Sequence, residues 1–248
     1  MKICMIGSGY VGLVSGACFA ELGNNVICLD KNLNKISNLK NGVIPIYEPG
    51  LEELIQRNVK QKRLQFSTNI SKSIIKSDII FICVGTPTKI KSNEADLKYV
   101  FQVVRDIKKN LNKYKIIVTK STVPVTTGDK IQNLLTTKNN KKLFDVVSNP
   151  EFLREAYAKD DFINSEFVLL GGRKSLCQNV KDFYEEHTKC KTSNFLLTDI
   201  VTALFAKYTI NTFLASKVIF FNELFEVFQK SDSSESWEYF TKINLCFY

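Results

Sequence analysis

Three glycines near the N-terminus have the spacing of a phosphate-binding loop. Gly7, Gly9 and Gly12 form Gly-x-Gly-x-x-Gly between an apolar run at 2–6 and a helical pattern at 10–22. In such a loop the first glycine permits a tight turn, the second lets the backbone approach a pyrophosphate, and the third lets the helix pack against the strand. The helix N-terminus then directs free N–H groups and a positive dipole end at the phosphates. The pattern predicts a dinucleotide-binding βαβ unit.

Asp30 closes the second apolar run, 25–29, and indicates which dinucleotide binds. A carboxylate at this position accepts hydrogen bonds from a ribose 2′-hydroxyl and repels a 2′-phosphate, so NAD is favoured over NADP. Lys31 is adjacent and works against that preference. The alternative interpretation is a structural turn followed by an unrelated acid.

Polar groups also follow the ends of later apolar runs. Hydroxyl, amide and carboxylate side chains lie in the segments 84–87, 119–124 and 148–155. Ligands bind at the carboxyl ends of the strands in open parallel sheets, so these segments suit a nucleotide and a polar substrate. Each segment alone could be a capped turn, but three behind a nucleotide fingerprint favour a site.

Two pairs of polar residues have helical spacing. Glu151 and Glu155 would share one face of a helical turn, where one carboxylate acts as a base and the other tunes it or positions a water. Lys207 and Asn211 would likewise share a face and stabilise a developing oxyanion. A surface helix pair is the alternative in each case, and the apolar neighbours of Lys207 and Asn211 weaken it there.

The elements that must position these residues alternate along the chain. Alternating strands and helices predict an α/β fold: a Rossmann-type, doubly wound, mostly parallel sheet followed by a long central helix. We expect an NAD-binding domain over 1–198, a central helix of the dimerisation type over 199–230, and a truncated tail over 231–248. The predicted strands are 2–6, 25–29, 64–67, 78–84, 115–120, 143–148, 166–170 and 194–197. The predicted helices are 10–22, 32–40, 50–62, 96–110, 126–137, 152–159, 174–186 and 199–229.

The composition is that of an ordinary globular protein, with 44% hydrophobic and 24% charged residues. The net charge of +9 is carried by scattered lysines, which favours solvated surfaces over a nucleic-acid partner. The chain has no apolar run of transmembrane length, so no membrane partner is expected. Seven cysteines without C-x-x-C spacing indicate a reducing cytoplasm, and a single histidine, His187, predicts no metal site.

Six segments together resemble the UDP-glucose 6-dehydrogenase family, within the wider UDP- and GDP-sugar dehydrogenases. They are, in order, G-x-G-Y-V-G-L at the glycine loop, P-I-Y-E-P-G-L (45–51), V-G-T-P (84–87), K-S-T-V-P-V (120–125), S-N-P-E-F-L-R-E (148–155) and K-Y-T-I-N-T-F-L-A-S-K (207–217). Their order and spacing are those of the family from the N-terminus to about Phe240.

The resemblance implies a function and a set of site residues. The family oxidises a sugar-nucleotide alcohol to a carboxylate through two NAD-dependent hydride transfers. By resemblance, NAD is held by Gly7, Gly9, Tyr10, Val11, Gly12, Asp30, Lys35, Thr86, Thr122 and Glu155. The substrate is lined by Glu151, Phe152, Leu153, Arg154, Glu155, Lys207 and Asn211, and the catalytic set comprises Thr122, Glu151, Glu155, Lys207 and Asn211. The central helix resembles a homodimerisation element.

The chain departs from the family in one respect. The family carries a G-G-x-C-F-P-K-D segment, whose cysteine forms a thioester intermediate, and a second α/β domain for the nucleotide sugar; we expect both to be absent here. Cys246 lies in N-L-C-F-Y, without the flanking glycines or Pro-Lys-Asp. We therefore expect the chain to be inactive alone. The alternatives are a non-catalytic NAD-binding or assembly fragment, or a dehydrogenase of UDP-N-acetyl-mannosamine or GDP-mannose.

Overall fold

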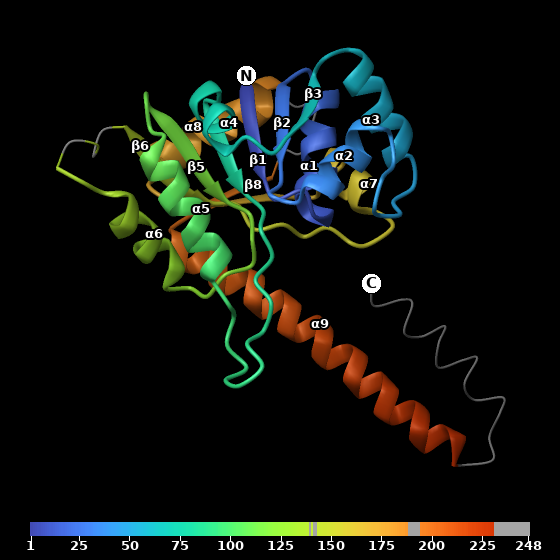
Figure 1. The fold of residues 1–248 in the computed structure, drawn as a ribbon. Helices are drawn as coiled ribbons and strands as arrows, with labels where there is room; N and C mark the ends of the chain where they lie inside the picture. Colours follow the sequence, from blue (N-terminus) through green and yellow to red (C-terminus); the bar gives the residue numbers. More distant parts are fainter. Residues whose placement is uncertain (139, 141–142, 188–193, 231–248) are drawn as a thin grey trace. The chain divides into compact units, whose positions relative to one another are not determined.

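The computed structural model describes residues 1–138, 140, 143–187 and 194–230. These residues form one eight-stranded sheet in the order β3-β2-β1-β4-β5-β6-β7-β8 (Figure 1). All strand pairs are parallel except β6 and β7, which meet at a single antiparallel pair, Ser148 and Gly171. The strands are β1 Lys2–Ile6, β2 Asn25–Leu29, β3 Leu64–Ser67, β4 Ile79–Ile82, β5 Lys115–Thr119, β6 Phe144–Ser148, β7 Val168–Gly171 and β8 Phe195–Thr198. The predicted fold class is confirmed.

Helices cover both faces of the sheet, as the two separate apolar clusters show. The first cluster joins one sheet face to α1 Tyr10–Glu21, α2 Leu33–Lys40, α3 Leu51–Lys60, α7 Ala158–Ile163 and α8 Lys174–His187. The second joins the other face to α4 Ile70–Lys76, α5 Lys98–Lys109, α6 Thr127–Leu135 and the start of α9 Ile200–Gln229. Strand β4, the residues of β1 after Lys2 and the centre of β5 are buried on both faces, which explains why these stretches are continuously apolar.

One predicted helix is misplaced and one helix was not predicted. The segment 152–159 was expected to be helical, but α7 begins only at Ala158, and Ala156 has a left-handed φ of 68°. A non-glycine residue in that region interrupts a right-handed helix. The short helix α4 begins at an Asn69 N-cap, whose side chain accepts a hydrogen bond from the Lys72 amide at 2.9 Å.

Helix α9 crosses the boundary between two compact units, Met1–Phe205 and Ala206–Tyr248. Within the second unit, much of the apolar surface of α9 is exposed: Phe213 is 63% exposed, Phe220 58% and Val227 63%. Cys246 and the rest of the predicted tail lie outside the described residues. The described part of the chain contains no helix long and apolar enough to cross a membrane.

Candidate dinucleotide-binding site

The candidate site lies where the direction of strand progression reverses. From β1 the chain continues to β2 and β3 on one side, then returns to β4 on the other side of β1. The carboxyl ends of β1 and β4 are therefore adjacent, and such a switch point leaves a crevice for a ligand. The Gly7 amide donates to the Leu29 carbonyl at 2.8 Å, and the Cys83 amide donates to the Ile6 carbonyl at 2.8 Å. The loops after β1, β2 and β4 thus meet at one edge.

A different steric constraint explains why each of the three loop positions is a glycine. Gly7 has a φ of 106°, and a Cβ there would lie 2.7 Å from the Cys83 carbonyl oxygen. A Cβ on Gly12 would lie 1.9 Å from the Gly7 carbonyl oxygen, so only glycine allows α1 to approach the loop. Gly9 is different, because among the described residues no atom other than those of its chain neighbours lies within 4 Å of an added Cβ. The open space at Gly9 is what close approach of a pyrophosphate requires.

The N-terminus of α1 is free of side-chain caps. Its N-cap residue is Gly9, which has no side chain to cap the helix, and the first turn carries no acidic residue. The first backbone N–H groups of a helix have no intrahelical acceptors, and in the part of the chain that the structure describes no side chain caps this end of α1. They are available to an anionic group above the Gly9 opening.

The Asp30 carboxylate is held at the end of β2 by three donors. Oδ1 accepts from the Asn32 amide at 3.0 Å, while Oδ2 accepts from the Ser8 amide at 3.1 Å and from Lys35 Nζ at 2.9 Å. Burial alone would raise the pKa of Asp30, but these amides and the Lys35 ammonium together lower it below its usual value. Asp30 is therefore a fixed anion, tied directly to the glycine loop through Ser8.

A pocket of about 430 Å³ opens beside these groups. That volume lies in the range of small-molecule and cofactor sites. Of the predicted cofactor residues, Gly7, Gly9, Asp30 and Lys35 line the pocket. Its other lining residues come from the ends of β1, β2 and β4, from the segment Thr68–Ile70, and from α5.

The predicted residues Thr86 and Thr122 lie together but do not line this pocket. The Thr86 hydroxyl donates to the Thr122 backbone carbonyl at 2.8 Å, so the V-G-T-P and K-S-T-V-P segments are joined. Ser121 strengthens the junction, because its hydroxyl donates to the Val84 carbonyl at 2.6 Å. Both threonines are partly buried, and they extend the strand-end surface from β4 to β5.

Tyr10 connects the start of α1 to two distant segments. Its hydroxyl donates to Glu48 Oε2 and accepts from the Ala156 amide at 3.2 Å. Glu48 is 6% exposed, and its other oxygen accepts from the Lys159 amide at 3.1 Å. Burial and then the hydrogen bond to Glu48 raise the pKa of the Tyr10 hydroxyl. Through these hydrogen bonds the 45–51 motif holds the 151–159 segment in place. Glu48 is thus a positioning residue that the sequence alone did not reveal.

The segment 151–157 is irregular, so the expected helical pairing of Glu151 and Glu155 is wrong. Glu151 Oε2 accepts from the Leu153 amide at 2.8 Å, which closes a local turn in place of a helix. Glu151 is partly buried and Glu155 is exposed. Arg154 turns toward Asp161, with its guanidinium Nε 3.1 Å from Oδ2 and a second nitrogen 2.7 Å from Oδ1.

Aromatic contacts hold the same segment in place. The rings of Phe152 and Phe167 lie 4.9 Å apart between centroids, and Leu153 packs against the first apolar cluster. Three of the predicted substrate residues, Glu151, Phe152 and Leu153, also line a small pocket of about 40 Å³.

The same small pocket is also lined by a polar network, formed by Lys120, Asn149 and Tyr184, that the sequence prediction missed. Asn149 Oδ1 accepts from Lys120 Nζ at 3.2 Å and from the Tyr184 hydroxyl at 2.8 Å, and Asn149 Nδ2 donates to the Leu169 carbonyl at 3.0 Å. Lys120 is only 5% exposed. Buried lysines are rare, so a lysine directly after an apolar strand was an available signal. Tyr184 comes from α8, and no local pattern links it to Asn149.

Lys207 and Asn211 lie one turn apart on α9, as their spacing predicted. Both belong to the second compact unit.

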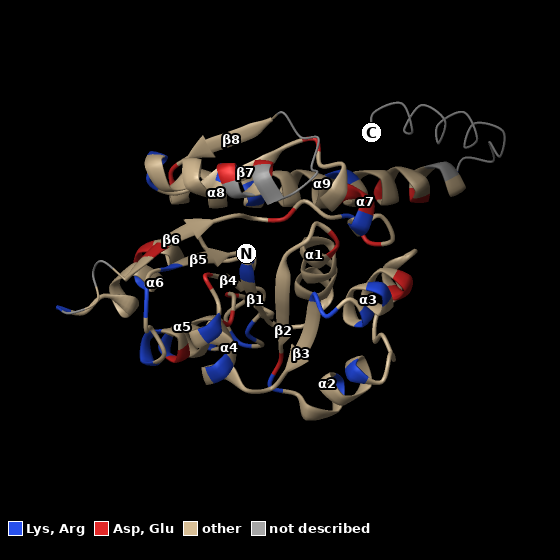
Figure 2. Ribbon diagram, turned by 90° about the horizontal axis from the view of Figure 1, so that it is seen from above, with Lys and Arg blue, Asp and Glu red and all other residues tan. Residues whose placement is uncertain are grey.

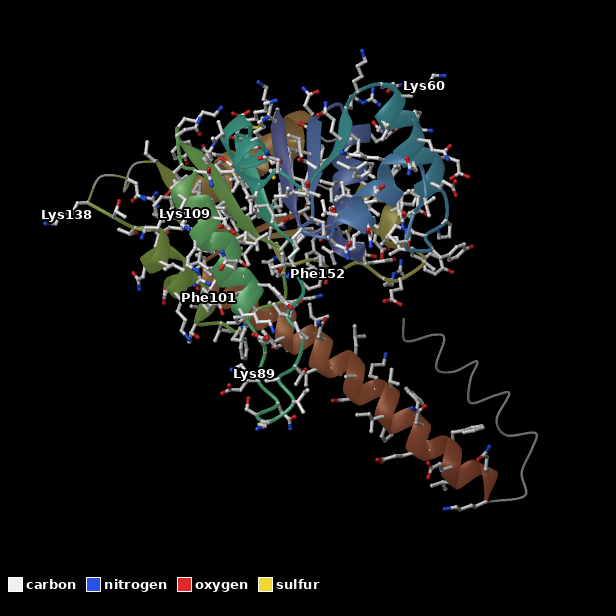
Figure 3. All side chains as sticks on the ribbon, in the orientation of Figure 1. Lys60, Lys89, Phe101, Lys109, Lys138 and Phe152 are labelled. Carbon is white, nitrogen blue, oxygen red and sulfur yellow. The ribbon has the colours of Figure 1, made fainter. Side chains whose placement is uncertain are left out.

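The basic charge does not gather at this site. Lys and Arg positions occur on most helices of the first unit and are interspersed with Asp and Glu (Figure 2). The labelled lysines Lys60, Lys89, Lys109 and Lys138 come from four separate segments (Figure 3). Among the described residues, no group of three or more His, Cys, Asp or Glu side chains could hold a metal ion.

The fold and the site together define a Rossmann-type dinucleotide-binding domain. An open glycine backbone, uncapped helix N–H groups and a fixed carboxylate suit the pyrophosphate and ribose of NAD. The chain belongs to the UDP-glucose/GDP-mannose dehydrogenase family, because the model of the family's NAD binding domain matches residues 1–188.

Individual relatives agree with this family. The UDP-glucose 6-dehydrogenase TuaD of Bacillus subtilis is 46% identical over 230 residues, which are 92% of this chain and 49% of that protein. The UDP-glucose 6-dehydrogenase of Rhizobium meliloti is 43% identical over 232 residues, covering 93% of this chain and 53% of that protein. The chain thus spans about half the length of these curated relatives.

Solved structures show the same fold. A ternary complex of GDP-mannose dehydrogenase from Pseudomonas aeruginosa aligns with a TM-score of 0.83 and 35% identity, over 90% of this chain and 52% of that one. A UDP-glucose dehydrogenase from Pyrobaculum islandicum aligns with a TM-score of 0.82 and 33% identity, over 90% of this chain and 51% of that one.

Proposed function

We propose that the chain is the NAD-binding part of a dehydrogenase that oxidises UDP-glucose to UDP-glucuronate in two hydride transfers. The observation that carries the proposal is the glycine loop with Asp30 at the β1/β4 switch point. The names of the two Bacillus subtilis and Rhizobium meliloti relatives support the choice of substrate. NAD supplies the hydride acceptor when it is bound.

The cofactor role belongs to two groups of residues. The N–H groups above Gly9 and the side chain of Asp30 would bind the pyrophosphate and the ribose, with Lys35 fixing the carboxylate. The remaining proposed cofactor residues are Gly7, Tyr10, Val11, Gly12, Thr86, Thr122 and Glu155. Tyr10 would act indirectly, since its hydroxyl is committed to Glu48 and Ala156.

The substrate role belongs to the 151–155 turn and to α9. Glu151, Phe152, Leu153, Arg154 and Glu155 would line the sugar. Because Glu151 and Glu155 do not share a helix face, we assign the general base to only one of them. Glu151 is partly buried and its carboxylate is fixed by the Leu153 amide, so it is the better positioned base.

Thr122, Lys207 and Asn211 complete the proposed catalytic set. An ammonium and an amide donor one helical turn apart suit a developing oxyanion, which is the role that we propose for Lys207 and Asn211. By the family resemblance, the exposed apolar face of α9 would form a homodimer.

Two alternatives remain specific enough to test. Relatives of known structure include a GDP-mannose dehydrogenase and a UDP-N-acetyl-mannosamine dehydrogenase, so another nucleotide sugar is one alternative. The other alternative is a non-catalytic NAD-binding or assembly role for a chain that spans about half the length of these relatives.

One pair of measurements tests the proposal. NAD is titrated into the chain by calorimetry, and UDP-glucuronate is then assayed after incubation with NAD and UDP-glucose, with GDP-mannose and UDP-N-acetyl-mannosamine in parallel. We expect NAD to bind and the 248-residue chain alone to form no UDP-glucuronate. Absence of NAD binding would remove the proposed function, and a UDP-glucuronate yield that grows with protein concentration would show that the chain is catalytic by itself.

A further inference from the structure

The dinucleotide pocket has a polar end that the glycine loop and Asp30 do not explain. Helix α5 lines it with Tyr99, Gln102, Val103 and Asp106, while Leu29, Ile70 and Val84 supply apolar surface. One pocket therefore contains a glycine loop suited to phosphate, the Asp30 carboxylate suited to a ribose, and a partly apolar region, called the chamber below, with the polar side chains Gln102 and Asp106. This is the set of surfaces that the adenosine half of a dinucleotide needs.

The aromatic wall of this chamber is held by cations. Lys31 Nζ lies 4.4 Å from the centre of the Tyr99 ring, and Lys98 Nζ lies 4.9 Å from it. Attraction between ammonium groups and an aromatic face restrains both partners. Tyr99 is thereby tied to the residue that follows Asp30, so the ribose and base ends of the pocket are coupled.

Gln102 and Asp106 form an oriented donor–acceptor pair. Gln102 Nε2 donates to the Asp106 carboxylate, 3.3 Å from Oδ1 and 3.2 Å from Oδ2. An Arg105 guanidinium nitrogen donates to Gln102 Oε1 at 3.1 Å. Because an amide oxygen accepts and an amide nitrogen donates, these two neighbours fix which way the Gln102 amide faces. One N–H of Gln102 and further lone pairs of Asp106 remain to meet a ligand.

We propose that Gln102 and Asp106 read the base of the dinucleotide and select adenine. Asp106 accepts a hydrogen bond from the 6-amino group, and the second N–H of Gln102 donates to the ring nitrogen N1. Hypoxanthine has the opposite pattern, with a 6-oxo acceptor and an N1–H donor. Its oxygen would face the Asp106 carboxylate, and the fixed amide of Gln102 would present a donor to a donor. The proposal rests on NAD being the cofactor of the pocket.

A pair of the same kind elsewhere provides the control. On α8, Gln178 Nε2 donates to Asp182 Oδ1 at 2.7 Å, with the same spacing as Gln102 and Asp106. Neither Gln178 nor Asp182 lines the dinucleotide pocket. If Gln102 and Asp106 were only a surface helix pair that contacts no ligand, substitutions in the two pairs would affect dinucleotide binding equally.

The test compares two dinucleotides by calorimetric titration of the full chain. NAD and nicotinamide hypoxanthine dinucleotide are titrated into the unsubstituted chain and into the Asp106→Asn, Gln102→Ala and Asp182→Asn variants. We expect NAD to bind about tenfold more tightly than the hypoxanthine analogue, because the analogue cannot form the two hydrogen bonds that adenine makes with Asp106 and Gln102. Asp106→Asn and Gln102→Ala should reduce that ratio severalfold, and Asp182→Asn should keep it.

The outcomes separate base selection from cofactor binding. Equal binding of the two dinucleotides to the unsubstituted chain, or an unchanged ratio in Asp106→Asn and Gln102→Ala, would overturn the role of this pair while leaving the NAD site intact. If neither dinucleotide binds, the cofactor site itself fails and base selection fails with it. Gln102 is exposed on α5, and circular dichroism verifies that the substituted chains are folded.

Discussion

At the scale of single residues, Asp30 is the determinant of cofactor choice. Its carboxylate lies between Lys35, at 2.9 Å, and the Ser8 amide, at 3.1 Å, while Lys31 is held nearby against Tyr99. Two ammonium groups thus already flank the place of a ribose 2′-substituent. The negative charge of Asp30, at the end of β2, opposes a 2′-phosphate there.

The substitution Asp30→Asn should therefore shift preference toward NADP. We expect NAD to bind more weakly and NADP more tightly, changing the affinity ratio by about tenfold or more, since charge contacts of this kind are worth about 1–3 kcal/mol. Calorimetric titration of both cofactors measures the ratio. Asp160→Asn, an exposed acid on α7, is the matched control. An Asp30→Asn chain with the original ratio would show that Asp30 does not read the 2′ position.

The lowered pKa of Asp30 also predicts a pH dependence. Burial raises this pKa, but the Asn32 amide, Lys35 and the Ser8 amide outweigh it, so the folded-state value lies below that of the unfolded chain, about 3.9. The stabilisation by Asp30 is then fully present above about pH 4 and is lost as the pH falls through the lower folded-state value. Urea unfolding at a series of pH values should show a smaller acid-side loss for Asp30→Asn than for the unsubstituted chain. Parallel curves for the two proteins would contradict this assignment.

At the scale of elements, Glu48 braces three segments. It accepts from Tyr10 at the start of α1 and from the Lys159 amide in α7, and it is nearly fully buried. Replacing one carboxylate oxygen with an amide group removes the negative charge and one of the two acceptors, so the charge-assisted hydrogen bond from Tyr10 or from the Lys159 amide is lost.

Glu48→Gln should lower the free energy of unfolding by about 1–3 kcal/mol. Glu53→Gln, on the exposed first turn of α3, is the control and should change it by less than about 0.5 kcal/mol. Chemical denaturation measures both. Equal effects of the two substitutions would mean that the brace contributes nothing to stability.

The strands and the glycine loop were predictable because their signals are local. Strand β4 is an uninterrupted apolar run, and the roles of Gly7 and Gly12 follow from their spacing. The helix predicted over 152–159 failed because Ala156 adopts a left-handed φ, and the Ala156 amide instead donates to Tyr10, far away in the sequence. Helix α4 was missed because its seven residues are too few to show a helical repeat of apolar residues.

The rest of the site depends on contacts between distant segments. Glu48 meets Tyr10 across 38 positions, and Tyr184 meets Asn149 across 35. Neither contact leaves a trace in the local pattern of hydrophobic residues. Lys120 is the one residue of this network with a local signal that was not used, since a lysine directly after an apolar strand can indicate a buried polar partner.

At the scale of the whole molecule, the exposed apolar surface of α9 predicts that the chain self-associates. Its exposed apolar side chains include Phe205 at 65%, Phe213 at 63% and Phe220 at 58%. Exposed apolar area beyond a few hundred Å² marks an interface or an aggregation hazard, and covering it gains about 25 cal/mol per Å². The chain should therefore dimerise or aggregate through this helix.

Light scattering combined with hydrogen exchange tests that expectation. Replacing Phe213 and Phe220 with serine should reduce the associated fraction severalfold, whereas Ile90→Ser, at a fully exposed position outside α9, should not. A soluble monomer whose α9 amides are fully protected from exchange would contradict the prediction.

The central claim is that the glycine loop binds the pyrophosphate of NAD. Apart from its chain neighbours, no described residue has an atom within 4 Å of a Cβ at Gly9, and the residue has an ordinary φ of −79°, so Gly9→Ala should fold with nearly unchanged stability. That same methyl group would occupy the space which the pyrophosphate must approach. Calorimetric titration should therefore show NAD binding to the unsubstituted chain and at least about tenfold weaker binding to Gly9→Ala. Equal NAD affinity in the two proteins would contradict the account.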